Sequence, residues 1–337
     1  MKAVMSSAPG KARVGPFIRL LAFALFLTFD LIMFGAFVRV TDAGLGCPDW
    51  PGCYGKASPI GAMAHIREAA AVLPDGPVTV FKAWVEMLHR YVAAGLGLII
   101  IALVVLAHRD ARGRASVPLA WFTLVWILIQ GAFGAWTVTL KLQPAIVTAH
   151  LLGGMILFGL LVAQWVRIQV REGLPALSAG LRGLAWVACG VLFMQIALGG
   201  WVSTNYATLA CEDFPTCQGQ WWPVADFVRG FQLWRPLGQT ADGAALPFQA
   251  LTAIHLTHRL WAMLAFAALG VLAWKLRRED GRTARWLVFF LLLQLTTGLT
   301  NIFLDWPLAA AVLHTGGAAG LLGLTLMVAL RAPYRSL

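Results

Sequence analysis

The chain has 337 residues, of which 59% are hydrophobic and only 12% are charged, whereas a soluble domain carries roughly 25% charged residues. This composition excludes an ordinary soluble protein and predicts an integral membrane protein. The formal net charge of +11 would suggest a nucleic-acid partner in a soluble chain. In a membrane protein, positive charge instead marks the cytoplasmic side, so we expect a bilayer and no nucleic acid as the partner.

Eight segments are apolar enough to cross a hydrocarbon core of about 30 Å, which needs about 20 helical residues. In chain order they cover residues 17–38, 83–107, 117–138, 144–168, 181–202, 250–274, 284–304 and 308–331. Two connections are long, residues 39–82 and 203–249, and the others are short. The sequence therefore predicts an all-α integral membrane protein with eight transmembrane helices.

The basic residues gather on one side of these predicted helices. They are Lys2, Lys11, Arg13 and Arg19 at the start, Arg109, Arg112 and Arg114, then Arg167, Arg171 and Arg182, then Lys275, Arg277, Arg278, Arg282 and Arg285, and finally Arg331 and Arg335. Because Lys and Arg accumulate on the cytoplasmic side, we expect both termini in the cytoplasm. The two long loops are then expected on the outer face of the membrane.

The sequence contains two copies of one four-helix unit. The first long loop reads Cys47-Pro-Asp-Trp-Pro-Gly-Cys53 and the second reads Cys211-Glu-Asp-Phe-Pro-Thr-Cys217. A glycine, Gly35 or Gly199, lies twelve residues before each first cysteine. A parallel repeat of this kind has its axis along the membrane normal, so we expect two pseudo-symmetric four-helix bundles.

The repeat also divides the chain into expected segments. These are a basic cytoplasmic N-terminus (1–16), an N-terminal bundle (17–170), a cytoplasmic linker (171–180), a C-terminal bundle (181–331) and a tail (332–337).

Four histidines lie one to two turns inside predicted helices that begin at the outer surface: His89, His150, His258 and His314. Ionisable groups at this depth are costly, and they are functional candidates by default. Each bundle receives two histidines at one level on different helices, an arrangement that can hold a heme iron between two imidazoles. Zinc or di-iron sites fit less well because acidic side chains are scarce there. The alternative is that these histidines only bridge helices through hydrogen bonds.

Arg39, Arg90 and Arg259 lie near the same outer level, where a guanidinium can pair with the carboxylates of a heme. The alternative for them is snorkelling to the interface.

Glu86 shares a helical face with His89, three residues away, and the matching position in the second half is His255. Glu86 could accept a proton or stabilise a cation, which would make the first bundle the reactive one. Its alternative is a structural pair with Arg90, and the roles of His255 and Asp30 stay open.

The two pairs of loop cysteines lie on the outer, oxidising side of the membrane. We expect the disulfides Cys47–Cys53 and Cys211–Cys217. The second is expected to pin its loop, and whether the first is structural or exchanges thiols stays open.

These motifs resemble the heme A synthase family over about residues 17–331. The resemblance rests on Gly44-Leu-Gly-Cys47 through Cys53, Glu86-Met-Leu-His89-Arg90, His150-Leu-Leu-Gly-Gly154, Asn205-Tyr206, Cys211 through Cys217-Gln-Gly-Gln-Trp-Trp-Pro223, and His255-Leu-Thr-His258-Arg259. The chain differs at Thr41-Asp42-Ala43-Gly44, where the family often has Thr-Gly-Ser-Gly.

The resemblance implies an oxidoreductase that converts heme O to heme A for cytochrome oxidase by oxidising the C8 methyl group to a formyl group. It implies a resident heme b on His258 and His314, the substrate heme on His89 and His150, and an essential Glu86. It also implies heme O synthase and oxidase assembly factors as partners, together with an unidentified electron acceptor. A homo-oligomer is left open.

Three other functions are compatible with parts of the sequence. A two-heme b-type electron-transfer protein would explain the histidines but not the difference between Glu86 and His255. A membrane thiol oxidoreductase would use the cysteine pairs, although these lack the Cys-x-x-Cys spacing. A non-catalytic heme carrier or assembly factor is the third.

Overall fold

The computed structural model describes residues 15–74, 76–110 and 115–333. Within these ranges the chain forms α1 (Pro16–Val40), α2 (Met63–Val72), α3 (Val80–His108), α4 (Val117–Thr139), α5 (Pro144–Arg171), α6 (Ala179–Thr204), α7 (Phe227–Gly230), α8 (Phe248–Leu276), α9 (Gly281–Phe303) and α10 (Leu308–Ala329). All eight predicted spans are confirmed as helices long and apolar enough to cross a membrane. The described residues contain no β-strand, only isolated bridges, so the all-α prediction is confirmed.

Some expectations fall on residues outside the described ranges. They concern most of the N-terminal segment 1–16, part of the tail 332–337, and the cations Lys2, Lys11, Arg13, Arg112, Arg114 and Arg335.

Local signals explain where the long helices begin. Pro144 occupies the first position of α5, where its missing N–H costs nothing. The side chains of Ser178 and Asp280 cap α6 and α9 by accepting backbone N–H groups, as short polar residues do at helix starts. The two short helices α2 and α7 were not predicted, because ten and four residues are too few for a clear apolar period.

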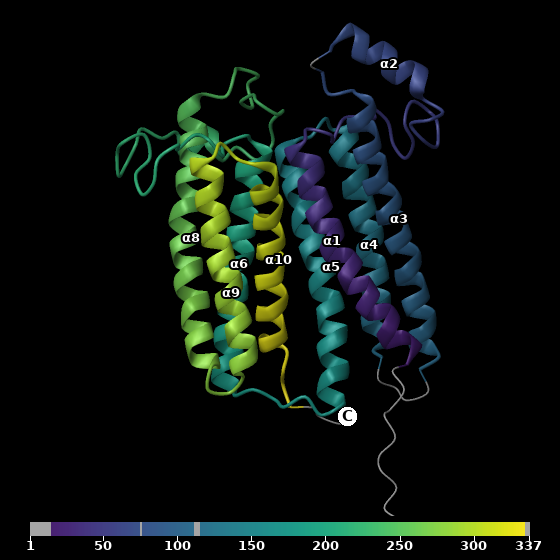
Figure 1. The fold of residues 1–337 in the computed structure, drawn as a ribbon, viewed down its shortest axis with the longest axis vertical. Coiled ribbons are helices and arrows are strands. Elements are labelled where there is room, and N and C mark those ends of the chain that lie inside the picture. Colours follow the sequence, from purple (N-terminus) through teal and green to yellow (C-terminus); the bar gives the residue numbers. More distant parts are fainter. Residues whose placement is uncertain (1–14, 75, 111–114, 334–337) are drawn as a thin grey trace, which may run out of the picture.

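The eight long helices pack as two groups of four (Figure 1). Helices α1, α3, α4 and α5 contact one another in the first group, and α6, α8, α9 and α10 do so in the second. The groups meet where α1 and α5 pack on α10 and where α5 packs on α6. The short helix α2 lies in the long loop between α1 and α3, beyond the ends of the first group's helices (Figure 1).

One apolar core continues across the junction of the two groups. It contains Ile32 and Phe158 from the first group and Leu192 and Leu322 from the second. Because lipid tails are as apolar as these side chains, close packing between the helices, and not removal from water, favours this core. Because this core takes side chains from both groups, the two groups pack against each other as one body.

Polar bonds close the junction at both ends. At the end that carries the long loops, Arg39 Nη2 of α1 donates to the carbonyl oxygen of Ser203 at 2.6 Å. At the opposite end, Arg331 pairs with Asp280 at 2.5 Å and donates to the carbonyl oxygen of Pro175. The segment between α5 and α6 is thereby tied to the last helix.

Candidate active site

Each of the four predicted histidines lies against a glycine of a neighbouring helix. A Cβ atom added at three of these glycines would lie 3.2–3.3 Å from the imidazole ring, tighter than ordinary van der Waals contact, and one added at Gly298 would lie 3.5 Å away. The pairs are His89 with Gly35, His150 with Gly134, His258 with Gly199 and His314 with Gly298. The missing side chains let the rings lie close to the helix backbone, so the four glycines form matching platforms for the four histidines.

All four histidines line one continuous cavity of about 1720 Å³. Typical small-molecule pockets measure about 300–1,000 Å³, so this cavity has room for two large ligands. His89 and His150 line the cavity from α3 and α5 of the first group, and His258 and His314 line it from α8 and α10 of the second. The structure therefore brings the histidines together in the two predicted pairs, one in each bundle.

A glutamine sets the level of the last histidine in each bundle. Gln130 Nε2 of α4 donates to the carbonyl oxygen of His150 at 2.6 Å. Gln294 Nε2 of α9 donates to the carbonyl oxygen of His314 at 2.7 Å. Because the accepting carbonyl belongs to the histidine itself, the first bond fixes the axial position of α5 relative to α4, and the second fixes that of α10 relative to α9.

Glu86 lines the cavity with only 4% of its surface exposed. Its Oε1 accepts a hydrogen bond from Arg90 at 2.5 Å, and its Oε2 accepts one from the backbone N–H of Cys47 at 2.8 Å. The loop comes this close because a Cβ at Gly46 would meet the backbone of Lys82 at 2.5 Å. The pair with Arg90 is thus present, and the carboxylate also positions the first disulfide loop.

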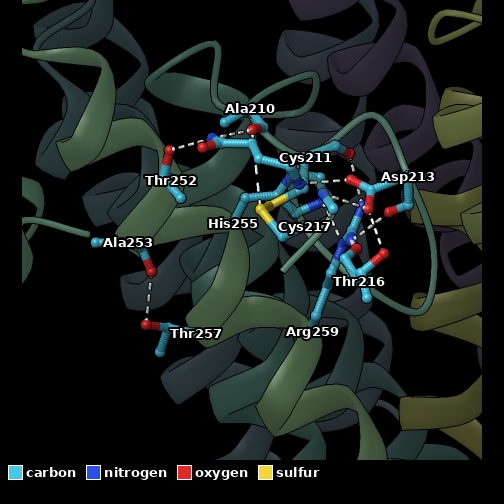
Figure 2. Close-up of a disulfide and its surroundings, with 12 residues drawn as sticks. Ala210, Cys211, Asp213, Thr216, Cys217, Thr252, Ala253, His255, Thr257 and Arg259 are labelled. Carbon is cyan, nitrogen blue, oxygen red and sulfur yellow. Dashed lines mark hydrogen bonds between the residues drawn. A yellow bond between two sulfur atoms is a disulfide. The ribbon is translucent and has the colours of Figure 1, made fainter. Parts of the chain in front are cut away.

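The second bundle has a histidine where the first has this glutamate. Arg259 Nε donates to His255 Nε2 at 3.2 Å. Figure 2 shows Arg259 reaching from α8 to the loop of the Cys211–Cys217 disulfide, where its donors meet the carbonyl oxygens of Cys211, Asp213 and Thr216 at 2.6–2.9 Å. His255 is buried, and its Nδ1 has no partner among the described residues. His255 therefore occupies the position in the second bundle that Glu86 occupies in the first, next to the equivalent arginine, but it is not a carboxylate.

The other two predicted arginines also contact loops and not only the cavity. Arg90 Nη1 donates to the carbonyl oxygens of Asp49 and Gly52 at 2.8 and 2.7 Å. Arg39 pairs with Asp42 at 3.0 Å, and its guanidinium lies 3.9 Å from the ring centroid of Tyr206. Simple snorkelling does not describe these side chains, because each binds specific groups while it lines the cavity.

Both expected disulfides are present, Cys47–Cys53 and Cys211–Cys217. All four cysteines are at most 2% exposed, so the sulfur atoms are shielded by the loops around them. The fifth cysteine, Cys189, is a buried free thiol in the apolar core of α6.

A family model described as cytochrome oxidase assembly protein matches residues 18–326 of the chain. A heme A synthase from Shewanella oneidensis is 40% identical over 310 residues, which cover 90% of this chain and 92% of that protein. The chain belongs to the heme A synthase family. Its resemblance to that family, drawn from the sequence motifs, is thereby confirmed.

Other heme A synthases are more distant in sequence. The protein from Caulobacter vibrioides is 28% identical over 337 residues, covering 90% of this chain and 92% of its own length. The protein from Halalkalibacterium halodurans is 28% identical over 298 residues, covering 84% and 86%. The alignments span almost the full length on both sides, so both bundles belong to the family's fold.

The donor set of this heme A synthase family member fits a heme. Paired neutral imidazoles are common axial ligands of heme iron. The glycine platforms leave an apolar wall close to each ring, and His150 Nδ1 is a buried polar atom without a partner among the described residues. A flat macrocycle with a central iron matches this combination of imidazoles and small residues.

Two polar side chains that contact histidines were missed by the sequence analysis. Gln195 Nε2 lies 3.2 Å from His258 Nδ1, and Thr297 Oγ1 lies 2.8 Å from His314 Nδ1. The available signal was a polar residue near a platform glycine in an otherwise apolar helix. Asp30, whose role was left open, is not among the described residues that line the cavity.

Asp213 organises the second disulfide loop, and its replacement by asparagine should expose the disulfide. Hydrogen bonds from the Thr216 hydroxyl and the backbone N–H groups of Gly219 and Gln218 lower the pKa of Asp213. Asparagine keeps only one accepting oxygen, so part of this set is lost. We expect Asp213→Asn to speed reduction of Cys211–Cys217 several-fold at neutral pH, measured by thiol labelling.

The exposed neighbour Glu212→Gln is the matched control and should leave the rate unchanged. Because the pKa of Asp213 is depressed, its contribution is present at neutral pH and is lost as the pH falls below the ordinary Asp value of about 3.9. The wild-type rate, corrected for the thiolate fraction of the reductant, should therefore rise only in strong acid. Equal rates for Asp213→Asn and wild type would show that the carboxylate does not hold the loop.

Proposed function

We propose that this protein is a heme A synthase, an oxidoreductase that oxidises the C8 methyl group of heme O to a formyl group to give heme A for cytochrome oxidase. The observation that carries the proposal is the arrangement of four histidines in two pairs around one cavity, with a carboxylate beside the first pair only. Two permanent electron-transfer hemes of equal status would not require this difference between the bundles.

In this proposal the second bundle holds a resident heme b through His258 and His314. When bound, that heme supplies a one-electron redox centre that relays electrons. The first bundle holds heme O as substrate through His89 and His150. The glycine platforms of both bundles let each ring turn its edge toward the cavity without a clash, which supports ligand binding in both places.

Glu86 is the proposed catalytic residue. Oxidation of a methyl group to a formyl group removes four electrons, which must pass to an external acceptor, and it releases protons. A carboxylate held near the substrate can accept a proton or stabilise positive charge. The bonds from Arg90 and Cys47 N–H fix the direction of this carboxylate, which supports a role that depends on orientation.

Arg39, Arg90 and Arg259 are the proposed contacts for the propionates of the two hemes. All three line the outer end of the cavity. Each guanidinium carries five N–H donors in a planar fork. Some of these donors already bind loop carbonyl oxygens or the carboxylate of Asp42. Propionate binding would use the remaining donors and would connect heme occupancy to the position of the disulfide loops.

The basic connections support an orientation with both termini in the cytoplasm and the disulfide loops outside, in a bacterial inner membrane. The proposed division is the substrate bundle 17–170, the linker 171–180 and the resident-heme bundle 181–331, with the basic segment 1–16 and the tail 332–337 on the cytoplasmic side. Heme O synthase and oxidase assembly factors are the proposed protein partners.

Heme extraction from membranes tests the reaction directly. The gene is expressed in cells that make heme O but lack their own heme A synthase, and the extracted hemes are separated by reversed-phase chromatography. We expect heme A to appear only with the intact gene, and heme O to accumulate with the empty vector and with His89→Ala. Identical heme profiles with gene and vector would refute the proposed reaction.

A further inference from the structure

The histidines of the second bundle have side-chain hydrogen-bond partners. Thr297 Oγ1 lies 2.8 Å from His314 Nδ1 and also 2.7 Å from the carbonyl oxygen of Leu293 in its own helix. A threonine hydroxyl has a single hydrogen, and the Leu293 carbonyl can only accept it. The His314 Nδ1–H must then donate to Thr297 Oγ1, which leaves Nε2 with a free lone pair. Thr297 therefore selects the tautomer in which Nε2 can bind iron.

Gln195 provides the corresponding partner for His258. Its amide lies 3.2 Å from Nδ1 and 3.3 Å from Nε2, and its buried Oε1 has no partner among the described residues. Turning the amide over would place Oε1 within reach of the N–H of the His258 ring, whichever ring nitrogen carries it. That arrangement satisfies the orphaned oxygen and gives His258 a side-chain acceptor, as Thr297 does for His314.

The first bundle lacks both of these side chains. Gln195 precedes Gly199 by four residues, and the residue four before Gly35 is Leu31. Thr297 directly precedes Gly298, and the residue directly before Gly134 is Phe133. The side chains of leucine and phenylalanine cannot accept a hydrogen bond.

The histidines of the first bundle are held differently as a result. His150 Nδ1 is buried without a partner in the described part of the chain. The His89 ring lies edge-on to Phe34 at 5.5 Å and has the backbone carbonyl of Leu31 as a hydrogen-bond partner. Neither contact reproduces the amide or hydroxyl of the second bundle.

The ring orientations follow this difference. At Gly298 and Gly199 an added Cβ would meet Cε1 and Nδ1 of the second-bundle histidines, so those rings turn Nδ1 toward the platform and Nε2 away from it. At Gly35 the added Cβ would meet Nε2 of His89 at 3.3 Å, and at Gly134 it would meet Cε1 of His150 at 3.3 Å and its Nε2 at 3.9 Å. The second pair is thus set to present Nε2 to a ligand, whereas the first pair must turn its rings to do so.

We propose that Gln195 and Thr297 are positioning residues that make the second bundle retain its heme, and that Leu31 and Phe133 leave the first bundle able to exchange its heme. This inference rests on the proposed function. Partners of a ligating histidine fix its tautomer and raise its basicity, and their loss typically costs 10–100-fold in affinity. A resident cofactor needs such partners, whereas a substrate and its product must leave.

The test compares Thr297→Val and Gln195→Leu with wild type, using purified protein loaded with heme b. Valine matches the shape of threonine without the hydroxyl, and Thr297→Ser restores the hydroxyl. Thr296→Val, one position away on the exposed side of α9, is the matched control. The readouts are the rate of heme transfer to excess apomyoglobin and the midpoint potential of the retained heme.

We expect Thr297→Val and Gln195→Leu to release the slowly exchanging heme about tenfold faster or more. Their midpoint potential should shift in the positive direction, because a less basic imidazole stabilises ferric iron less. Thr297→Ser and Thr296→Val should behave like wild type. If both Thr297→Val and Gln195→Leu match wild type in heme release rate and midpoint potential, the inference is wrong, while the proposed function still stands. If His314→Ala binds as much heme as wild type, the proposed function fails and the inference falls with it.

Discussion

Replacing Glu86 by glutamine is expected to reduce heme A formation by about 100-fold or more while both hemes stay bound. General acid–base groups typically contribute 10²–10⁴-fold, and glutamine has nearly the same shape but cannot accept the proton. Its Oε1 can still receive the bond from Cys47 N–H, so the loop should keep its place. The measurement is the ratio of heme A to heme O in extracts, with the heme content of the purified protein determined in parallel.

The control for this variant is Glu68→Gln, an exposed glutamate on α2, which should leave the ratio unchanged. A second comparison separates chemistry from structure. Arg90→Gln removes the ion pair but leaves the carboxylate, and it should lower the yield less than Glu86→Gln does. A normal heme A yield from Glu86→Gln would contradict the catalytic role.

Replacing Gly199 by leucine is expected to abolish retention of the second-bundle heme. A Cβ at this position would lie 3.2 Å from His258 Cε1, and the remaining leucine atoms need the volume that the ring occupies. Overpacking of this kind costs about 1–3 kcal/mol, which a membrane helix bundle can survive, but it displaces the imidazole. We expect at least a fivefold lower content of slowly exchanging heme, measured by pyridine hemochrome assay.

Gly190→Leu is the matched control in the same helix. A Cβ at Gly190 would meet nothing within 4 Å, so its side chain points into open space and should leave the heme content unchanged. Circular dichroism of both variants checks that the helices persist. Full heme content in Gly199→Leu would show that the ring does not need this platform.

Much of the fold was predictable because its signals are local. A run of about 20 apolar residues forms a helix in a bilayer whatever lies beside it, since every backbone polar group must be paired internally. The disulfides were also local, because each joins cysteines six residues apart. The helices α2 and α7 were not predicted, because they are too short to contain an apolar run of this length.

The candidate site was predictable only in part. The repeat placed His89 and His150 at one depth, and it singled out Glu86 by comparison with His255. It could not show that Arg90 and Arg259 bind the carbonyl oxygens of the disulfide loops. Those contacts join residues 38 and 48 positions apart, and no periodic pattern in the sequence predicts them.

By itself the sequence determined the eight membrane helices, the repeated unit and the types of side chain available for chemistry. Length, apolarity and internal repetition are properties of the chain read residue by residue. Only the tertiary structure decided which glycine supports each histidine and which histidines gain a hydrogen-bond partner. Gln195 and His258 are 63 residues apart, so their meeting depends on how α6 packs against α8. Packing between helices therefore gives two similar bundles different surroundings for the same imidazoles.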